Sequence, residues 1–180
     1  MGILGIYASQ ISGHLNVYAY ESIQTVTVGS GGSASINFTS IPSTYKHLQI
    51  RMRTKTTNTL DINFRFNGDS GNNYSSHGFY GDGGGGSLSA ITAYIGTSSG
   101  YIGYSPSTQG ASILDVFDYS NTNKNKLVRT QHGNDNNGSG YIMINSSEWM
   151  SSAAITSMEI LVASGTFEQN SKFSLYGVKG

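Results

Sequence analysis

Three glycines in the middle of the chain have the spacing of a dinucleotide-binding fingerprint. Gly81, Gly83 and Gly86 match G-x-G-x-x-G, in which glycines let the backbone approach a pyrophosphate at the start of a helix. Residues 87–90 read Ser-Leu-Ser-Ala, which does not indicate a helix, and no acidic residue follows about twenty positions on. Without the strand–helix context, we interpret this segment as a loop rather than a nucleotide site.

The run from Asn67 to Asn73 carries side-chain oxygens at alternating positions, as calcium loops do. An EF-hand loop also needs a glutamate at its twelfth position, where this chain has glycine or tyrosine, depending on the start chosen. A polar turn, in which Asn and Asp side chains bond their own backbone, explains the run better. We keep Asp69, Asn72 and Asn73 as candidates for a ligand or interface surface, with calcium at Asp69 as one option.

Histidine and cysteine usage indicates no metal site. His14, His47, His77 and His132 stand singly, with no pair spaced to place two imidazoles on one side of an ion. We interpret each as a surface or turn residue, and nothing favours a three-histidine site assembled from distant strands. Cysteine is absent, which rules out disulfides, thiolate zinc sites and a cysteine nucleophile. We therefore expect no cofactor and no metal.

Acidic pairs are the remaining catalytic candidates. Glycoside hydrolysis needs two carboxyl groups roughly 5–10 Å apart in a cleft. Asp115 with Asp118, or Glu148 with Glu159, could meet in the fold, but we interpret these carboxylates as hydrogen-bonding or ion-pairing partners. A serine triad is recognised by geometry rather than by sequence. From these signals together we predict that the chain is not an enzyme.

Tyrosine is the most unusual feature of the composition, with twelve tyrosines against one tryptophan. The tyrosine ring offers a large amphipathic contact area at low entropic cost, which suits binding surfaces. Several tyrosines near the glycine-rich segment could stack on sugars or fill a subunit interface, although cross-strand packing explains some of them without a ligand. These residues are Tyr74, Tyr80, Tyr94, Tyr101 and Tyr104.

The elements that must position these side chains are predicted to be strands. From His47 to Arg53, and again over 61–66, apolar residues alternate with polar or charged ones, so each segment has one buried face and one wet face. Runs of β-branched and aromatic residues between turn-rich gaps predict further strands at 22–28, 33–38, 112–119, 124–131, 140–145, 155–162 and 172–178. About nine or ten antiparallel strands predict a β-sandwich or barrel.

The segments between the strands are predicted to be turns and loops. Gly81 to Pro106 is predicted to be a long glycine-rich loop, and loops of that length usually have a function or are mobile. Residues 146–154 could form a brief turn of helix, with Trp149 packing inward. Hairpin loops are predicted at 29–32, 120–123 and 134–140.

The first twenty residues, Met1 to Tyr20, lack steady alternation and are predicted to be an arm that precedes one sandwich domain over 21–180. No Lys or Arg comes before their apolar residues, and polar residues interrupt them, so we expect neither a signal peptide nor a membrane span. The arm residues expected to make assembly contacts are Ile3, Leu4, Ile6, Tyr7 and Ile11.

Charge and length limit the possible partners. The 180 residues can bury a core without metals or disulfides. Charged residues make up only 11% of the chain and the formal net charge is zero, so the composition gives no electrostatic footprint for nucleic acid or anionic membranes. Near-zero net charge favours association, which predicts contacts with copies of the chain or with neighbours in an assembly.

Eight stretches of the chain carry a resemblance to a known group of proteins: GILGIYASQI at 2–11, TVTVGSGG at 25–32, FTSIP at 38–42, YKHLQIR at 45–51, FRFNGD at 64–69, NNY at 72–74, DVFDYSNT at 115–122 and FSLYGVKG at 173–180. Through them the chain resembles a group of small virion proteins of tailed bacteriophages along nearly its whole length, with Gly81 to Pro106 the least alike. This resemblance implies a jelly-roll-like structural protein, and its motifs contain no catalytic residues to carry over.

From the resemblance and the composition we expect an all-β, antiparallel, jelly-roll-like sandwich with an N-terminal arm. The expected role is that of a homotrimeric decoration or cement protein on a phage head, made in the host cytoplasm and located in the virion. Its expected partners are copies of itself and the major capsid protein or tail proteins, with no nucleic acid and no membrane. Two alternatives remain open: a tail, baseplate or fibre component, and a carbohydrate-binding module for host attachment.

Overall fold

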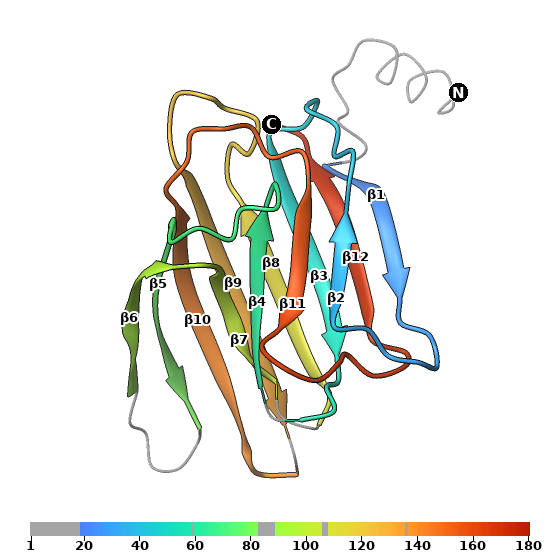
Figure 1. The fold of residues 1–180 in the computed structure, drawn as a ribbon. Helices are drawn as coiled ribbons and strands as arrows, with labels where there is room; N and C mark the ends of the chain where they lie inside the picture. The colour runs from blue at the N-terminus through green and yellow to red at the C-terminus, as the bar shows by residue number, and fades with distance from the viewer. Residues whose placement is uncertain (1–18, 59, 83–88, 106–107, 136) are drawn as a thin grey trace, which may run out of the picture.

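The structure, a computed structural model, describes residues 19–58, 60–82, 89–105, 108–135 and 137–180 (Figure 1). None of the described segments contains a helix long and apolar enough to cross a membrane. The strands are β1 (Tyr20–Thr27), β2 (Ser35–Phe38), β3 (His47–Thr54), β4 (Leu60–Phe66), β5 (Tyr74–Gly81), β6 (Ser89–Thr97), β7 (Gly100–Ser105), β8 (Gly110–Val116), β9 (Lys126–Asp135), β10 (Gly140–Trp149), β11 (Met158–Val162) and β12 (Lys172–Val178).

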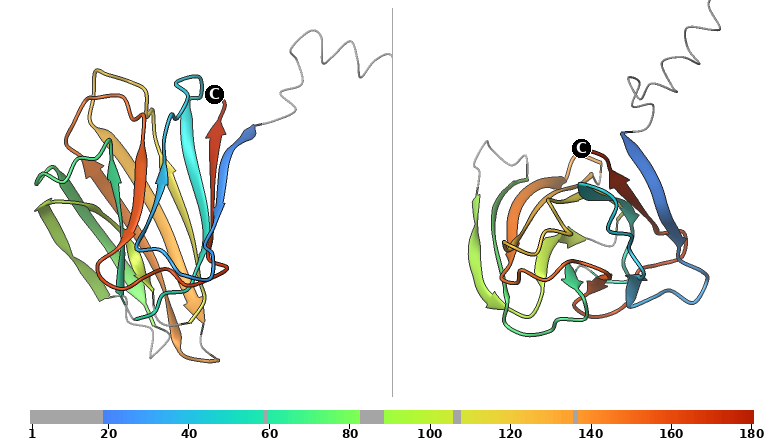
Figure 2. Two further views of the ribbon diagram at one scale, coloured as in Figure 1. Left: turned by 45° about the vertical axis from the view of Figure 1, so that its right-hand side comes forward. Right: turned by 90° about the horizontal axis from the view of Figure 1, so that it is seen from above.

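The strands form two antiparallel sheets packed face to face (Figures 1 and 2). The large sheet has eight strands in the order β1-β12-β3-β8-β9-β10-β5-β6, and the small sheet has four in the order β2-β11-β4-β7. Without the hairpins β5–β6 and β9–β10, the orders reduce to β1-β12-β3-β8 and β2-β11-β4-β7, which is the strand order of a jelly roll. The predicted all-β, jelly-roll-like sandwich is therefore confirmed.

The core lies between the sheets, where each strand turns its apolar residues inward. On β4, Phe64 and Phe66 have no exposed surface, and their rings pack with those of Tyr74 and Trp149 at centroid distances of 5.0 to 6.4 Å. Such aromatic pairs contribute about 0.5–1.5 kcal/mol each beyond the area they bury. On β3 the inward residues are Leu48, Ile50 and Met52, as the alternating pattern predicts.

All of the predicted strands occur, with ends displaced by a few residues, but β5 was not predicted and several local predictions are wrong. The segment Gly81 to Pro106 is not one long loop, because it contains strands β6 and β7. Residues 146–149 are not helical, because β10 runs through them to Trp149. The side chain of Trp149 does point inward and is 3% exposed, as predicted.

Strand β7 lacks the apolar pattern of a strand because it faces polar side chains, which form hydrogen bonds with its backbone. The backbone N–H of Tyr101 donates to Ser76 Oγ at 3.2 Å, and the carbonyl of Ile102 accepts from Thr130 Oγ1 and Asn145 Nδ2 at 3.1 and 2.8 Å. These three partners lie on β5, β9 and β10 of the large sheet and are buried. This part of the interior is therefore polar, which removes the apolar alternation that marks a strand in sequence.

The predicted hairpin at Gly29 to Gly32 is also wrong. The segment joins β1, which pairs with β12 in the large sheet, to β2, which pairs with β11 in the small sheet. A tight turn does occur there, as predicted, because Gly32 has a φ of 68° and its N–H donates a hydrogen bond to the carbonyl of Gly29. The predicted hairpins at 120–123 and 134–140 do join paired strands, β8 to β9 and β9 to β10.

The predicted arm lies largely outside the described residues, which begin at 19. Its proposed contact residues Ile3, Leu4, Ile6, Tyr7 and Ile11, and also His14, belong to that part of the chain. The described chain begins just before β1, whose first residue is Tyr20. Strand β1 is an edge of the large sheet.

Candidate assembly surface and ligand pocket

The run from Asn67 to Asn73 forms a polar turn, as predicted, and Asp69 holds it closed. The Asp69 carboxylate accepts hydrogen bonds from Trp149 Nε1 at 2.7 Å, from the N–H of Gly71 at 2.8 Å and from Asn73 Nδ2 at 3.0 Å. The bond from Trp149 is the main cause that lowers the pKa of Asp69. Asn72 is exposed beside this turn. Within the described ranges, no group of three or more His, Asp or Glu residues is placed to hold a metal ion.

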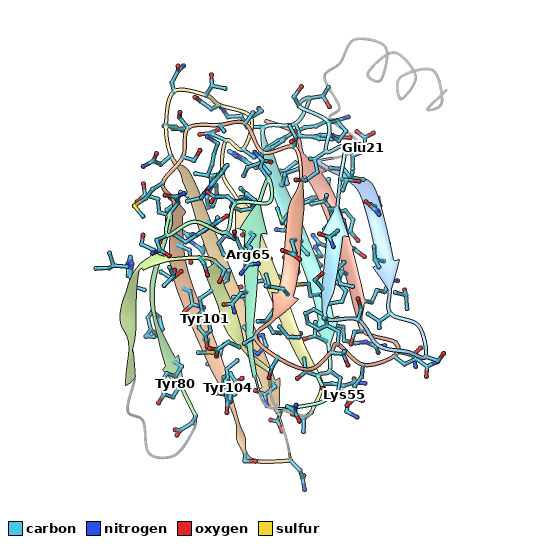
Figure 3. All side chains as sticks on the ribbon, in the orientation of Figure 1. Glu21, Lys55, Arg65, Tyr80, Tyr101 and Tyr104 are labelled. Carbon is cyan, nitrogen blue, oxygen red and sulfur yellow. The ribbon has the colours of Figure 1, made fainter. Side chains whose placement is uncertain are left out.

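The five candidate tyrosines do not form one surface. Tyr74 is fully buried, and its hydroxyl donates to the carbonyl of Asp69 at 3.1 Å and accepts from the N–H of Phe66 at 3.0 Å. Burial raises the pKa of Tyr74 to about 12. Tyr80 lies on β5 and Tyr101 and Tyr104 on β7 (Figure 3), and Tyr94 lies on β6. Tyr101 is 8% exposed, so its ring is not a stacking platform.

The predicted carboxylate pairs are bonded to other partners, as expected for structural groups. Asp118 accepts from Lys124 Nζ and pairs with Lys46 Nζ at 3.0 Å, and these two lysines hold its pKa at about 2. Three further pairings follow the same pattern: Asp115 with Gln49 at 2.7 Å, Glu148 with Asn125 at 2.9 Å and Glu159 with Arg65 at 3.8 Å.

His132 is a buried residue, so its interpretation as a surface or turn histidine is wrong. It is 2% exposed and lies on β9 among the inward-facing residues. Its Nε2 is 2.9 Å from the carbonyl oxygen of Tyr104, which can only accept, so Nε2 carries the proton. Nδ1 then accepts from Ser112 Oγ at 2.7 Å. Burial lowers the pKa of His132 to about 4, so the imidazole is neutral at physiological pH.

The other two described histidines are placed as predicted. His77 is exposed on β5. His47 is partly exposed at the start of β3, and its Nδ1 accepts from the N–H of Asp118 at 3.0 Å.

The outer face of the large sheet carries exposed apolar side chains at its centre. Ile142 on β10 is 63% exposed, Phe79 on β5 is 42% exposed and Ile113 on β8 is 38% exposed. Ile113 and Ile142 line a shallow, mostly apolar groove of about 430 Å³, and Phe79 lies outside this groove on the same face. Ala111 and Gly133 lie side by side in neighbouring strands of this groove, and their small size leaves it open. We call this region the outer-face patch.

Charged groups beside the outer-face patch are already partnered. Arg51 of β3 lies between the rings of Tyr20 and Tyr176, with its guanidinium carbon 5.1 Å from each ring centroid. Its Nε donates to Gln49 Oε1 at 2.8 Å, and Gln49 in turn donates to Asp115. Cation–π contacts of this kind contribute about 0.5–1 kcal/mol at exposed sites. A partner covering the patch would therefore desolvate few unpaired charges.

A second concave site, which we call the Asp61 pocket, lies where the β6–β7 turn meets the small sheet. It has a volume of about 230 Å³ and is lined by Asp61, Asn63, Tyr101 and residues 97–99. Asp61 and Asn63 come from β4, and Tyr101 comes from β7. Burial raises the pKa of Asp61, and a hydrogen bond from Tyr101 partly offsets this increase.

One motif in this pocket was missed in the sequence. Gly96 to Gly100 reads Gly-Thr-Ser-Ser-Gly, which matches the G-x-S-x-G pattern with Ser98 at its centre. A nucleophile elbow joins a strand to a helix, whereas this segment joins strands β6 and β7. The residues that line the pocket include no histidine to act as a base for Ser98. The motif is therefore interpreted as a tight turn.

Comparisons of the chain with models of known protein families, with curated proteins and with solved structures gave no match. What the chain does must therefore be inferred from its own residues and their geometry.

Proposed function

We propose that this chain is a structural protein of a bacteriophage particle, a decoration protein of the head that acts through contacts between subunits. Its body is the jelly-roll sandwich, and its partners are further copies of the chain, as a homotrimer, and the capsid beneath them. The near-zero net charge, which favours association between subunits, supports this assignment.

The observation that carries the proposal is the outer-face patch. Ile113, Ile142 and Phe79 expose aliphatic and aromatic surface on the outer face of the large sheet. The residues that alternate with them along these strands point inward to the packed interior. Exposed apolar groups that gather in one place mark interaction surfaces in soluble proteins, whereas isolated ones do not. Arg51 has its cation–π and hydrogen-bond partners within the same chain, so a contact over the patch need not supply them.

The size of the face fits the same role. Eight strands spaced about 4.8 Å apart, each with about eight residues rising about 3.3 Å, give a face of roughly 1,000 Å². A standard protein–protein interface buries about 800 Å² on each partner. We therefore propose that the outer face of the large sheet contacts a second copy of the chain.

Sedimentation analysis of the purified full-length chain tests the subunit contact. The wild type is expected to form an oligomer, and Ile142→Asp is expected to yield a folded monomer, because a charge would be buried without a partner. Met150→Asp is the matched control, since Met150 is 41% exposed and lies just beyond the end of β10. A wild type that stays monomeric at all concentrations, or Ile142→Asp and Met150→Asp with equal effects, would contradict the proposed contact.

Labelling of intact particles tests the location. Antibodies against the chain, visualised with gold in electron micrographs, are expected to decorate the head. Label confined to the tail would replace the decoration role with the tail-component alternative. If the chain is detected among the proteins of the particles but the intact particles carry no label, the chain lies inside them. That result would overturn the surface role.

A further inference from the structure

The Asp61 pocket has the composition of a binding site for a neutral, hydroxyl-rich molecule. Its lining combines one carboxylate from Asp61, one amide from Asn63, and the hydroxyl and backbone groups of Thr97, Ser98 and Ser99. A carboxylate can accept hydrogen bonds from two adjacent hydroxyl groups, and an amide can both donate and accept. The adjacent hydroxyl groups of a sugar ring can each donate and accept a hydrogen bond, which matches these partners.

The charge of the pocket argues against other ligand classes. A phosphate or carboxylate ligand would be repelled by Asp61, the one charged residue among the described residues that line the pocket. A bound calcium or magnesium ion needs several oxygen ligands, usually with more than one carboxylate. No such acidic cluster occurs in the part of the chain that the structure describes.

The walls of the pocket are held in place by hydrogen bonds. Thr97 Oγ1 donates to the carbonyl of Ser99 at 2.9 Å, which closes the β6–β7 turn. Arg65 Nε donates to the carbonyl of Ser98 at 3.0 Å, and this ties the turn to β4. Figure 3 shows Arg65 and Tyr101 in this region. Because the turn is fixed before a ligand arrives, binding loses less conformational entropy.

Asp61 is the group that would gain most from a ligand. Burial disfavours its charged form, and the hydrogen bond from Tyr101 compensates only in part. Hydroxyl groups of a ligand would donate further hydrogen bonds to this carboxylate, and such charge-assisted bonds are about twice as strong as neutral ones. Tyr101, although too buried to stack on a sugar, orients the carboxylate toward the pocket.

The geometry points to the Asp61 pocket as a binding site for one neutral sugar ring, contacted by Asp61, Asn63 and the turn at Ser98 and Ser99. The volume of about 230 Å³ is below the roughly 300–1,000 Å³ of pockets for drug-sized ligands, which limits the occupant to about one ring. This activity would be separate from the assembly role and does not depend on it.

Saturation-transfer NMR with the full-length chain tests this inference. The probes are glucose, galactose, mannose, N-acetylglucosamine and N-acetylgalactosamine, each titrated with and without EDTA. At least one sugar is expected to bind with a dissociation constant in the range of about 1 mM. Asp61→Asn and Asn63→Ala are each expected to weaken binding about tenfold or more, because each removes hydrogen bonds to the ligand.

Asn37→Ala is the matched control, because Asn37 is exposed on β2 of the same sheet. It is expected to bind like the wild type. Urea unfolding followed by Trp149 fluorescence shows whether each variant is folded. The inference is overturned if none of the five sugars binds, if the two pocket variants bind like Asn37→Ala, or if EDTA abolishes binding. Particle location and oligomeric state would stay the same in any of these cases.

Discussion

The buried histidine His132 predicts how the stability of the fold depends on pH. Its imidazole is 2% exposed, and burial keeps it neutral although the hydrogen bond to the carbonyl of Tyr104 acts in the opposite direction. The pKa is about 4 in the folded chain and about 6.5 in an unfolded chain. Between these two values the unfolded state binds more protons, so the free energy of unfolding increases with pH across this window.

The magnitude follows from the two pKa values. The contribution of His132 to the free energy of unfolding is fully present above pH 6.5 and is lost as the pH falls toward 4. At pH 5 an unfolded chain is almost fully protonated at His132 and the folded chain is not, which lowers the free energy of unfolding by about 2 kcal/mol relative to pH 8. Asp118 titrates at about pH 2, below this window. The raised pKa of Asp61 acts in the opposite direction, because protonation then favours the folded state.

Urea unfolding monitored by Trp149, which is the only tryptophan and is 3% exposed, measures the effect at pH 8, 6.5, 5 and 4.5. His132→Gln removes the titrating group and is expected to reduce the slope between pH 6.5 and 4.5, although it also lowers stability at pH 8. His77→Gln is the control, since His77 is exposed on β5. If His132→Gln keeps the slope of the wild type, the account of His132 as a buried neutral group is refuted.

Four further variants test other parts of the structure. Lys126→Met should lower the free energy of unfolding by about 3 kcal/mol in urea titrations, because Lys126 Nζ donates to the carbonyls of Asn121, Lys124 and Ser152 from a fully buried position. Gly100→Ala should cost about 1–3 kcal/mol in the same assay, since a Cβ there would overlap the ring of Phe64. Tyr74→Phe should cost about 1–3 kcal/mol, because the N–H of Phe66 loses its partner. Deletion of residues 1–18 should abolish binding to particles in a pelleting assay while leaving the urea midpoint unchanged; normal occupancy would contradict the role of the arm.

Alternation of apolar and charged residues predicted strands that have one apolar face and one charged face. Leu48, Ile50 and Met52 against Arg51 and Arg53 gave β3 almost to the residue. Strands β5, β6 and β7 were not predicted, and the interior beside β7 is polar. There the backbone of β7 is bonded by side chains of the large sheet, so inward-facing residues need not be hydrophobic.

Some errors reflect what local chemistry cannot encode. Glycines at 29–32 specify a tight turn but not whether the flanking strands pair with each other or enter different sheets. His132 could have been identified as buried, since it continues the alternation of Lys126, Val128 and Thr130 along β9. The Asp61 pocket could not, because Asp61 and Ser98 are brought together only by the pairing of β4 with β7, which are not neighbours in the sequence.

The two added hairpins connect the proposed surface with the pocket. A minimal jelly roll would have four strands in the large sheet, with an outer face of roughly 450 Å², about half of what a standard interface buries on one partner. Hairpins β9–β10 and β5–β6 double that face and supply Ile142 and Phe79. The same β5–β6 hairpin leads into the turn at residues 97–99 that lines the Asp61 pocket. The two hairpins add outer surface to the large sheet, and on its inner face their polar side chains form hydrogen bonds with the backbone of β7. The hairpins therefore extend the area available for binding without requiring a larger apolar core.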